Sequence, residues 1–421
     1  MAGNKSARIL LIGIVIGVIA GILSGWFVGK PMESVAWLGE LFLNALKMLI
    51  LPLIIAAVVS GIVSLGDVRK FGRLGGSTLL FFVFTSLMAV VVGLVVVNLI
   101  GPGVGVNLPD GGVPETVAEK EAVGFKEILL SLISPNLIKS AYDLQLLPII
   151  IFAMLFAAAL SQIPDNKVMV DFFHRLNDVM MKLVNWVMWF APIGIFALIA
   201  GRLGKAGGGE EFLVELEAVG KYVVTVLVAL GVHFVLLLLI ATGFAKRSFR
   251  FLGTMSRALF TAFGTASSSA TVPVTMECAR AEGVNKKSLQ FAIPLGSTIN
   301  MNGTALYEAV AVLFIAQVYG MDLSLGEQII VALTATLAAI GAAGIPEAGL
   351  VTMVIVLNAV GLPLDGVGLI LTVDWFLDRF RTAVNVWGDA VASVFVDRLI
   401  QLGVVPDSSV TPDPENSSLS D

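Results

Sequence analysis

Charged side chains are scarce in this sequence of 421 residues, at 14%, whereas a soluble protein carries roughly 25%. Hydrophobic residues make up 57% of the chain, and the mean hydropathy is +0.94. Such a composition excludes an ordinary soluble globular protein and indicates that lipid is the main solvent. The formal net charge of −5 and the lack of a large basic block make a nucleic-acid partner unexpected.

Cysteine and histidine are also rare. Cys278 is the only cysteine, which excludes an internal disulfide and a cysteine-rich zinc site. The only histidines, His174 and His233, have no fixed spacing to the serines at 267–269, so an intramembrane serine protease is disfavoured. We therefore expect no enzyme and no organic cofactor.

Long apolar runs are abundant. A helix needs about 20 apolar residues to span a bilayer. The first run is too long for a signal-peptide core, so we expect it to be retained. The sequence predicts six spans before the last third of the chain, at Ile9–Val28, Val35–Leu65, Ser77–Ile100, Leu146–Gln162, Met180–Gly201 and Val219–Phe244.

The positions of lysine and arginine predict how the chain is threaded. Basic clusters precede span one and follow spans two and six, which places both termini in the cytoplasm. The basic residues at 280–287 can share that side only if Phe251–Met276 enters and leaves on one face, as a re-entrant hairpin. Ile329–Val360 contains GAAGIPEAG and predicts a second hairpin from outside. The order hairpin, helix, hairpin, helix indicates the inverted repeat of secondary transporters.

A polar stripe marks the final span, Gly366–Ile400. Steps of four, four, three and four residues place five polar side chains on one helical face, with Arg381 beside them: Asp374, Asp378, Thr382, Asn385 and Asp389. One hypothesis is that Asp378 and Arg381 neutralise each other and hold two helices together. The other is that Asp378 binds an ammonium group and Arg381 clamps a carboxylate, with the serines at 267–269 holding a second carboxylate. That ligand is an amino acid with an additional acidic group.

Four segments in order, SSSATVP, NMNGTALYEA, GAAGIPEAG and DWFLDRFRTAVNVWGD, resemble the signatures of one family. It is the dicarboxylate/amino acid:cation symporter family, the glutamate and aspartate transporters with their prokaryotic homologues. The resemblance covers nearly the whole chain, including KMLILP and FTSLMAVVVG. It implies an all-α polytopic membrane protein with eight transmembrane helices, two re-entrant hairpins and inverted repeats. It further implies an elevator-type homotrimer in the cell membrane.

The resemblance also divides the chain into domains. A scaffold comprises residues 1–76 and 127–216, which carry spans one, two, four and five. The transport domain comprises residues 77–101 and 217–402, with spans three and six, both hairpins and the last two helices. Residues 102–126 form an extracellular loop, and residues 403–421 a disordered cytoplasmic tail.

Site residues follow from the resemblance alone. The substrate site falls on Ser268, Thr304, Ile345, Gly349, Asp378, Arg381, Thr382 and Asn385. A first sodium site falls on Gly296, Asn300, Asn385 and Asp389, and a second on Thr298, Met301 and backbone carbonyls from Ala339 to Ala342. A third would use Thr85, Ser86, Asn300 and Asn302. The second hairpin, around Gly341–Gly349, is predicted to be the external gate.

Two departures from the family pattern bear on function. Arginine often precedes the hairpin serines, but here Ala266 does, and the extra arginine is Arg379. Asn302 replaces an aspartate, which predicts a weak third sodium site. A buried carboxyl group favours its protonated form, so Glu308 is the predicted proton carrier, or else stays protonated and only donates a hydrogen bond.

The break within STINMNGTALYEAV is attributed to Gly303, which permits the chain to unwind. Asn300 and Thr304 would share a face, and Asn302 would point elsewhere. The favoured function is uptake of L-aspartate or L-glutamate coupled to sodium and assisted by a proton. The alternatives are a neutral amino-acid exchanger, a C4-dicarboxylate symporter and an anion channel.

Overall fold

A computed structural model describes residues 2–63, 68–106, 133–142, 146–206, 210–341, 348–363 and 366–405, and all regular structure in these ranges is helical. The first part of the chain contains α1 (Ala2–Val28), the 3₁₀ helix η1 (Lys30–Val35), α2 (Ala36–Val63), α3 (Val68–Ile100), α6 (Leu137–Tyr142), α7 (Leu146–Leu160), α8 (Lys167–Trp189) and α9 (Ala191–Ala206). The second contains α10 (Glu210–Leu239), the π-helical turn η2 (Ile240–Phe244), α11 (Arg250–Thr265), α12 (Ser268–Ala281), α13 (Lys286–Ile299), α14 (Asn302–Val318), α15 (Leu325–Gly341), α16 (Ala348–Val360) and α17 (Val367–Gln401).

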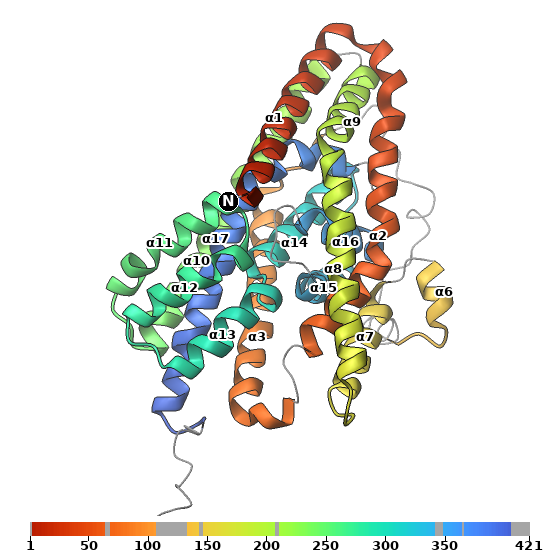
Figure 1. Cartoon of the computed structure of the whole chain (residues 1–421). Helices are drawn as coiled ribbons and strands as arrows, with labels where there is room; N and C mark the ends of the chain where they lie inside the picture. Colours follow the sequence, from red (N-terminus) through yellow and green to blue (C-terminus); the bar gives the residue numbers. More distant parts are fainter. Residues whose placement is uncertain are drawn as a thin grey trace, which may run out of the picture.

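One group of helices packs around α9. α1 and α2 both lie against it, and α2 also contacts α7 and α8. Glycines every four residues along α1 permit this approach, since a Cβ at Gly17 would collide with the carbonyl oxygen of Pro192 on α9. In Figure 1, α1, α2 and α9 extend together at the top of the molecule.

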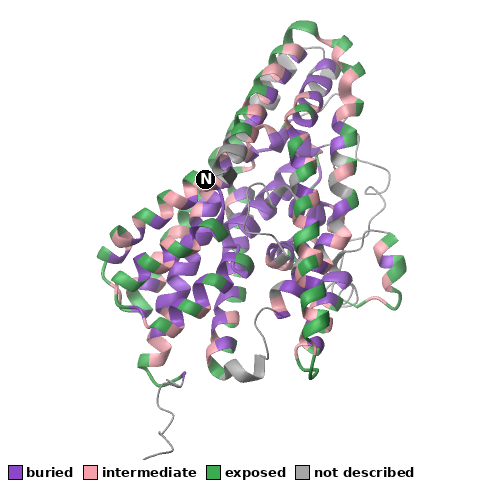
Figure 2. Cartoon of the chain, in the orientation of Figure 1, coloured by how far each residue is buried: buried purple, intermediate pink, exposed green. Residues whose placement is uncertain are grey.

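A second group surrounds α14. This helix lies among α3, α10, α15, α16 and α17, and every residue from Asn302 to Ala316 is buried. Figure 2 shows the buried residues concentrated in the middle of the molecule, with exposed residues along the outer helices. Because α14 has no face toward solvent or lipid, each of its polar side chains needs a partner inside the protein or in a bound ligand.

Two pairs of antiparallel helices correspond to the predicted hairpins. α11 packs against α12, and Ala266 in the turn between them adopts a left-handed conformation with φ 48°. α15 packs against α16, and residues 342–347 between them lie outside the described residues. The first hairpin lies against α13 and α17, whereas the second also contacts α2 and α7.

The segment predicted as the span Met180–Gly201 is bent, and its crossing of the membrane as one span stays a prediction. α8 begins earlier, at Lys167, and the chain bends by 51° between Trp189 and Ala191, after which α9 lies along α1. Pro192 explains the break, because proline has no backbone N–H to continue the hydrogen bonds of α8.

Length and apolarity in the described ranges qualify three helical segments as membrane spans: Arg73–Ile100, Glu217–Phe244 and Lys286–Val318. The bent pair α8 and α9 adds a fourth if it is counted as one span. The other apolar helices are shorter, so the number of eight spans stays a prediction.

Candidate functional site

The helix that carries STINMNGTALYEAV is broken at two residues. α13 ends at Ile299 and α14 begins at Asn302, while Asn300 (φ −99°, ψ 63°) and Met301 (φ −92°, ψ 56°) are not helical. The attribution of the break to Gly303 is therefore wrong, because Gly303 lies inside α14. Glycine is needed there for another reason: a Cβ would collide with the backbone of Arg381 on α17.

Asp389 is the charged member of a buried cluster beside this break. Its Oδ1 accepts a hydrogen bond from Asn300 Nδ2 at 3.0 Å, and the Thr85 hydroxyl lies 3.4 Å from Asn300 Oδ1. A Cβ at Gly296 would collide with the Asp389 carboxylate, so α13 and α17 are in direct contact here. These side chains offer hard oxygen ligands of the kind that alkali and alkaline-earth cations prefer.

Asn302 belongs to the same cluster. Its Oδ1 accepts a hydrogen bond of 2.8 Å from Ser86 Oγ, and its Nδ2 has no hydrogen-bond partner among the described residues. A Cβ at Gly388 would lie 2.9 Å from this nitrogen and 3.0 Å from Asn300 Nδ2. On a regular helix Asn302 would point away from Asn300, but the backbone between them is not helical, and both amides lie near Gly388.

The predicted second sodium site is only partly assembled. Met301 is buried, and its sulfur lies 3.3 Å from Asn385 Nδ2. Thr298 is exposed and donates a hydrogen bond of 3.0 Å to Leu295 O in its own helix. Ala339 is buried on α15, and Ala342 lies outside the described residues. This site stays a prediction.

Arg381 lies at the centre of the polar stripe and is completely buried. Its Nη2 donates a hydrogen bond of 2.7 Å to Asp378 Oδ1, and its Nη1 lies 3.4 Å from Asp374 Oδ1. The ring of Tyr307 lies 4.0 Å from the guanidinium carbon, which is close enough for a cation–π contact. Asp378 and Arg381 therefore do pair, but within one helix, so the pair does not join two helices.

The other predicted substrate residues surround this pair. A Cβ at Gly349 would collide with Arg381 Nη1, so the second hairpin (α15 and α16, hereafter hairpin 2) packs directly on the guanidinium. Asn385 links α14 to α17: its Nδ2 donates to Thr304 Oγ1 at 3.2 Å, and its Oδ1 accepts from the Gly303 N–H at 2.7 Å. The Thr382 hydroxyl donates to Asp378 O at 2.8 Å, and Ile345 lies outside the described residues.

The first hairpin (α11 and α12, hereafter hairpin 1) contributes a buried serine. Ser268 is the first residue of α12, and Ser267 caps that helix by accepting a hydrogen bond of 3.2 Å from Ala270 N, while Ser269 is exposed. Arg379 of α17 donates through Nη1 to Phe263 O and Gly264 O, both at 3.1 Å, near the end of α11. The extra arginine thus holds the turn that presents the serines.

Glu308 is fully buried on α14. Neither of its carboxyl oxygens makes a hydrogen bond of standard geometry to the described residues, and its polar neighbours are the Thr352 hydroxyl on α16 and the Arg381 guanidinium. A fully buried carboxyl group beside the stripe fits both alternatives for Glu308: a proton carrier, or a group that stays protonated and only donates a hydrogen bond.

Two residues at this site were missed as site residues. Asp374 shares the periodic stripe, so its contact with Arg381 was predictable from spacing. Tyr307 precedes Glu308 in the sequence, and no pattern there indicates that its ring lies on Arg381.

Comparison with known proteins agrees with this geometry. The model of the sodium:dicarboxylate symporter family matches residues 10–399. Excitatory amino acid transporter 3 of Homo sapiens is 38% identical, over 86% of this chain and 79% of its own length. Excitatory amino acid transporter 1 of Ambystoma tigrinum is 36% identical, over 88% of this chain and 78% of its own length. The chain belongs to the sodium:dicarboxylate symporter family.

Proposed function

We propose that this protein takes up acidic amino acids, L-aspartate or L-glutamate, by sodium-coupled secondary active transport. The observation that carries the proposal is the fully buried Arg381, whose Nε and Nη1 make no hydrogen bond to the described residues while Asp378 occupies Nη2. A guanidinium with unused donors suits a carboxylate, and Asp378 suits an ammonium group. The similarity to excitatory amino acid transporters supports the same class of substrate.

The proposed ion coupling rests on the cluster around Asp389. We propose that one sodium ion binds at Gly296, Asn300, Asn385 and Asp389 and a second at Thr298, Met301 and hairpin 2. Thr85, Ser86 and Asn302 add only neutral oxygens, so a third sodium ion is not expected there. Glu308 would then carry a proton as the substitute for that cation.

The proposed transport cycle follows the two groups of helices. The group around α9 would be the trimer-forming scaffold in the cell membrane, with both chain termini in the cytoplasm. The group around α14 would move as an elevator and carry the substrate with its ions. The contacts of hairpin 2 with α2 and α7 are consistent with a surface that slides along the scaffold.

The test is uptake of labelled aspartate into liposomes, with the sodium, proton and potassium gradients imposed separately. Saturable, sodium-driven uptake that shows counterflow supports the proposal, whereas an anion channel gives no counterflow. Uptake of serine or succinate in preference to aspartate would instead favour a neutral exchanger or a C4-dicarboxylate symporter.

A further inference from the structure

Asp374 is part of the stripe on α17, yet the proposed function gives it no role. It lies one turn before Asp378 and is only 3% exposed. Its Oδ1 is 3.4 Å from Arg381 Nη1, and this oxygen makes no hydrogen bond to the described residues. A second buried carboxylate is therefore directed at the guanidinium, in an ion pair that lacks hydrogen-bond geometry.

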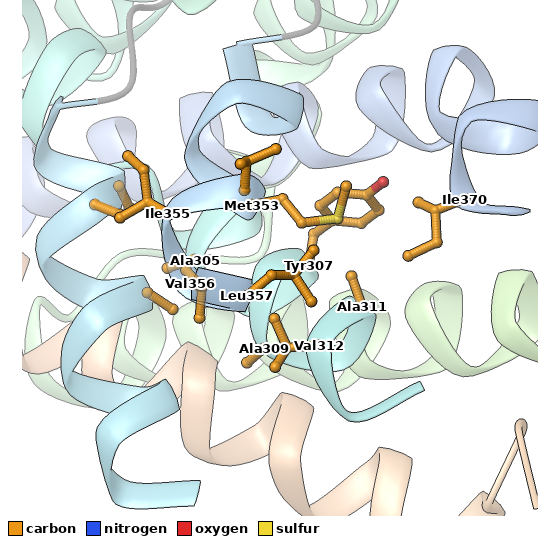
Figure 3. Packing of buried hydrophobic residues seen from close by; sticks show 14 of the residues in the cluster. Ala305, Tyr307, Ala309, Ala311, Val312, Met353, Ile355, Val356, Leu357 and Ile370 are labelled. Atoms are coloured by element: carbon orange, nitrogen blue, oxygen red, sulfur yellow. The ribbon is translucent and has the colours of Figure 1, made fainter. Parts of the chain in front are cut away.

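The surroundings of Arg381 restrict where another carboxylate can bind. The Tyr307 ring lies 4.0 Å from the guanidinium carbon, and Gly349 packs on Nη1. Figure 3 shows Tyr307 within the apolar cluster that also contains Met353, Leu357 and Ile370, which fixes its ring. With Nη2 bonded to Asp378, the donors left for a substrate carboxylate include the Nη1 group that Asp374 faces.

The formal charges of the site also disfavour binding of an acidic substrate. Two carboxylates and one guanidinium give Asp374, Asp378 and Arg381 a net charge of −1. An acidic amino acid also carries a net charge of −1, and charge repulsion is weakly screened at a buried site. A neutral amino acid lacks the side-chain carboxylate and neither competes for Nη1 nor adds negative charge.

We propose that Asp374 is a specificity-determining residue that competes with the side-chain carboxylate of an acidic substrate for Arg381. It thereby weakens the binding of acidic amino acids relative to neutral ones. A transporter gains from such competition, because a substrate held too tightly by a buried arginine is released slowly. This inference rests on the proposed role of Arg381 as the carboxylate clamp.

Asp374→Asn tests the proposal, because it removes the charge and keeps nearly the same volume. The Kd for L-aspartate, measured by isothermal titration of the purified protein in saturating sodium, should fall about tenfold, which is 1.4 kcal/mol. The Kd for L-asparagine or L-serine, measured by titration or competition, should change less than about twofold on the same scale. If Asp374 only supports the structure, Asp374→Asn should raise the Kd for every substrate, because loss of a supporting contact weakens binding.

The matched control is Asp397→Asn. Asp397 is also buried on α17 and pairs with an arginine, Arg247, at 2.6 Å, but it lies near the other end of the helix. Its replacement should leave the aspartate Kd unchanged. Asp374→Glu, which keeps the competing carboxylate, should show no gain in aspartate affinity, and Asp374→Ser, which also removes the charge, repeats the test if Asp374→Asn does not fold.

The proposal is overturned by weaker or unchanged aspartate binding in Asp374→Asn, by equal tightening for neutral substrates, or by tighter aspartate binding in Asp374→Glu. Failure of the wild-type protein to bind any acidic amino acid would refute the proposed function itself. Wild-type binding of aspartate with an unchanged Kd in Asp374→Asn would refute only the role of Asp374.

Discussion

Replacing Asn302 by aspartate adds a second carboxylate to the cluster that contains Asp389. Asn302 Oδ1 accepts a hydrogen bond from Ser86 at 2.8 Å, and the new carboxylate would keep that contact. Asn300 Nδ2 already donates to Asp389. The described residues of the cluster include no arginine or lysine that could balance the added charge. We expect the variant to recruit one more sodium ion for this reason.

The expected gain follows from the charge moved in each cycle. An aspartate anion taken up with two sodium ions and one proton moves two positive charges, and a third sodium ion raises this to three. For each tenfold change in the substrate ratio, the reversal potential of aspartate flux shifts by about 59 mV divided by the number of charges moved. The slope should therefore fall from ~30 mV in the wild type to ~20 mV in Asn302→Asp. At a tenfold sodium ratio and 100 mV, the additional ion contributes ~3.7 kcal/mol, which is roughly 500-fold in concentrating power.

The assay is labelled aspartate flux in proteoliposomes held at a series of membrane potentials. Asn98→Asp is the control, because Asn98 is an exposed amide that donates to Gln328 Oε1 far along α3 from Ser86, and its slope should stay at the wild-type value. A wild-type slope of ~20 mV per decade, or equal slopes in wild type and Asn302→Asp, would refute the reasoning.

Three further predictions concern the buried site. Arg381→Cys should abolish aspartate and glutamate transport while serine or alanine binding persists, and it should destabilise the protein by ~3–5 kcal/mol because two carboxylates lose their partner; unchanged aspartate affinity in binding assays would contradict this. Glu308→Gln should remove the response of uptake to an imposed pH gradient while sodium-dependent aspartate exchange continues, and a retained pH response would leave Glu308 without a proton-carrying role. Gly303→Ala should lower the thermal midpoint in detergent, with an overpacking cost of ~1–3 kcal/mol, because its Cβ meets the Arg381 backbone, whereas Gly220→Ala, which points into open space, should not.

The polar stripe was predictable because a helix repeats its faces at a fixed spacing. Asp378, Arg381 and Asn385 are buried on α17 as that spacing indicates. The spacing could not decide between the two hypotheses for Asp378 and Arg381, since residues three apart can pair with each other or share a ligand. Only the three-dimensional contacts show that the Tyr307 ring lies on the Arg381 guanidinium.

The two breaks in the helices were predictable to different degrees. The bend between α8 and α9 has a local signal in Pro192, which was available in the sequence. The break at Asn300 and Met301 has none, because no glycine or proline occupies either position. Asn300 bonds to Asp389 on another helix, a contact between residues 89 apart in the chain that no local pattern indicates. Sequence reasoning placed the break at Gly303 because glycine is the residue that usually permits one.

The burial of α14 bears on the proposed coupling of ions to substrate. Asn302 contacts Ser86 on α3, Thr304 contacts Asn385 on α17, and Glu308 neighbours Thr352 on α16. Three polar positions of α14 thus reach the proposed cation cluster, the proposed substrate clamp and hairpin 2. Since Asn385 also accepts the Gly303 N–H, we expect a cation that repositions the start of α14 to move the groups proposed to bind substrate as well. A rigid, fully buried helix with partners on three sides therefore provides a direct physical route for coupling, and variants at Asn302 should alter substrate affinity as well as ion dependence.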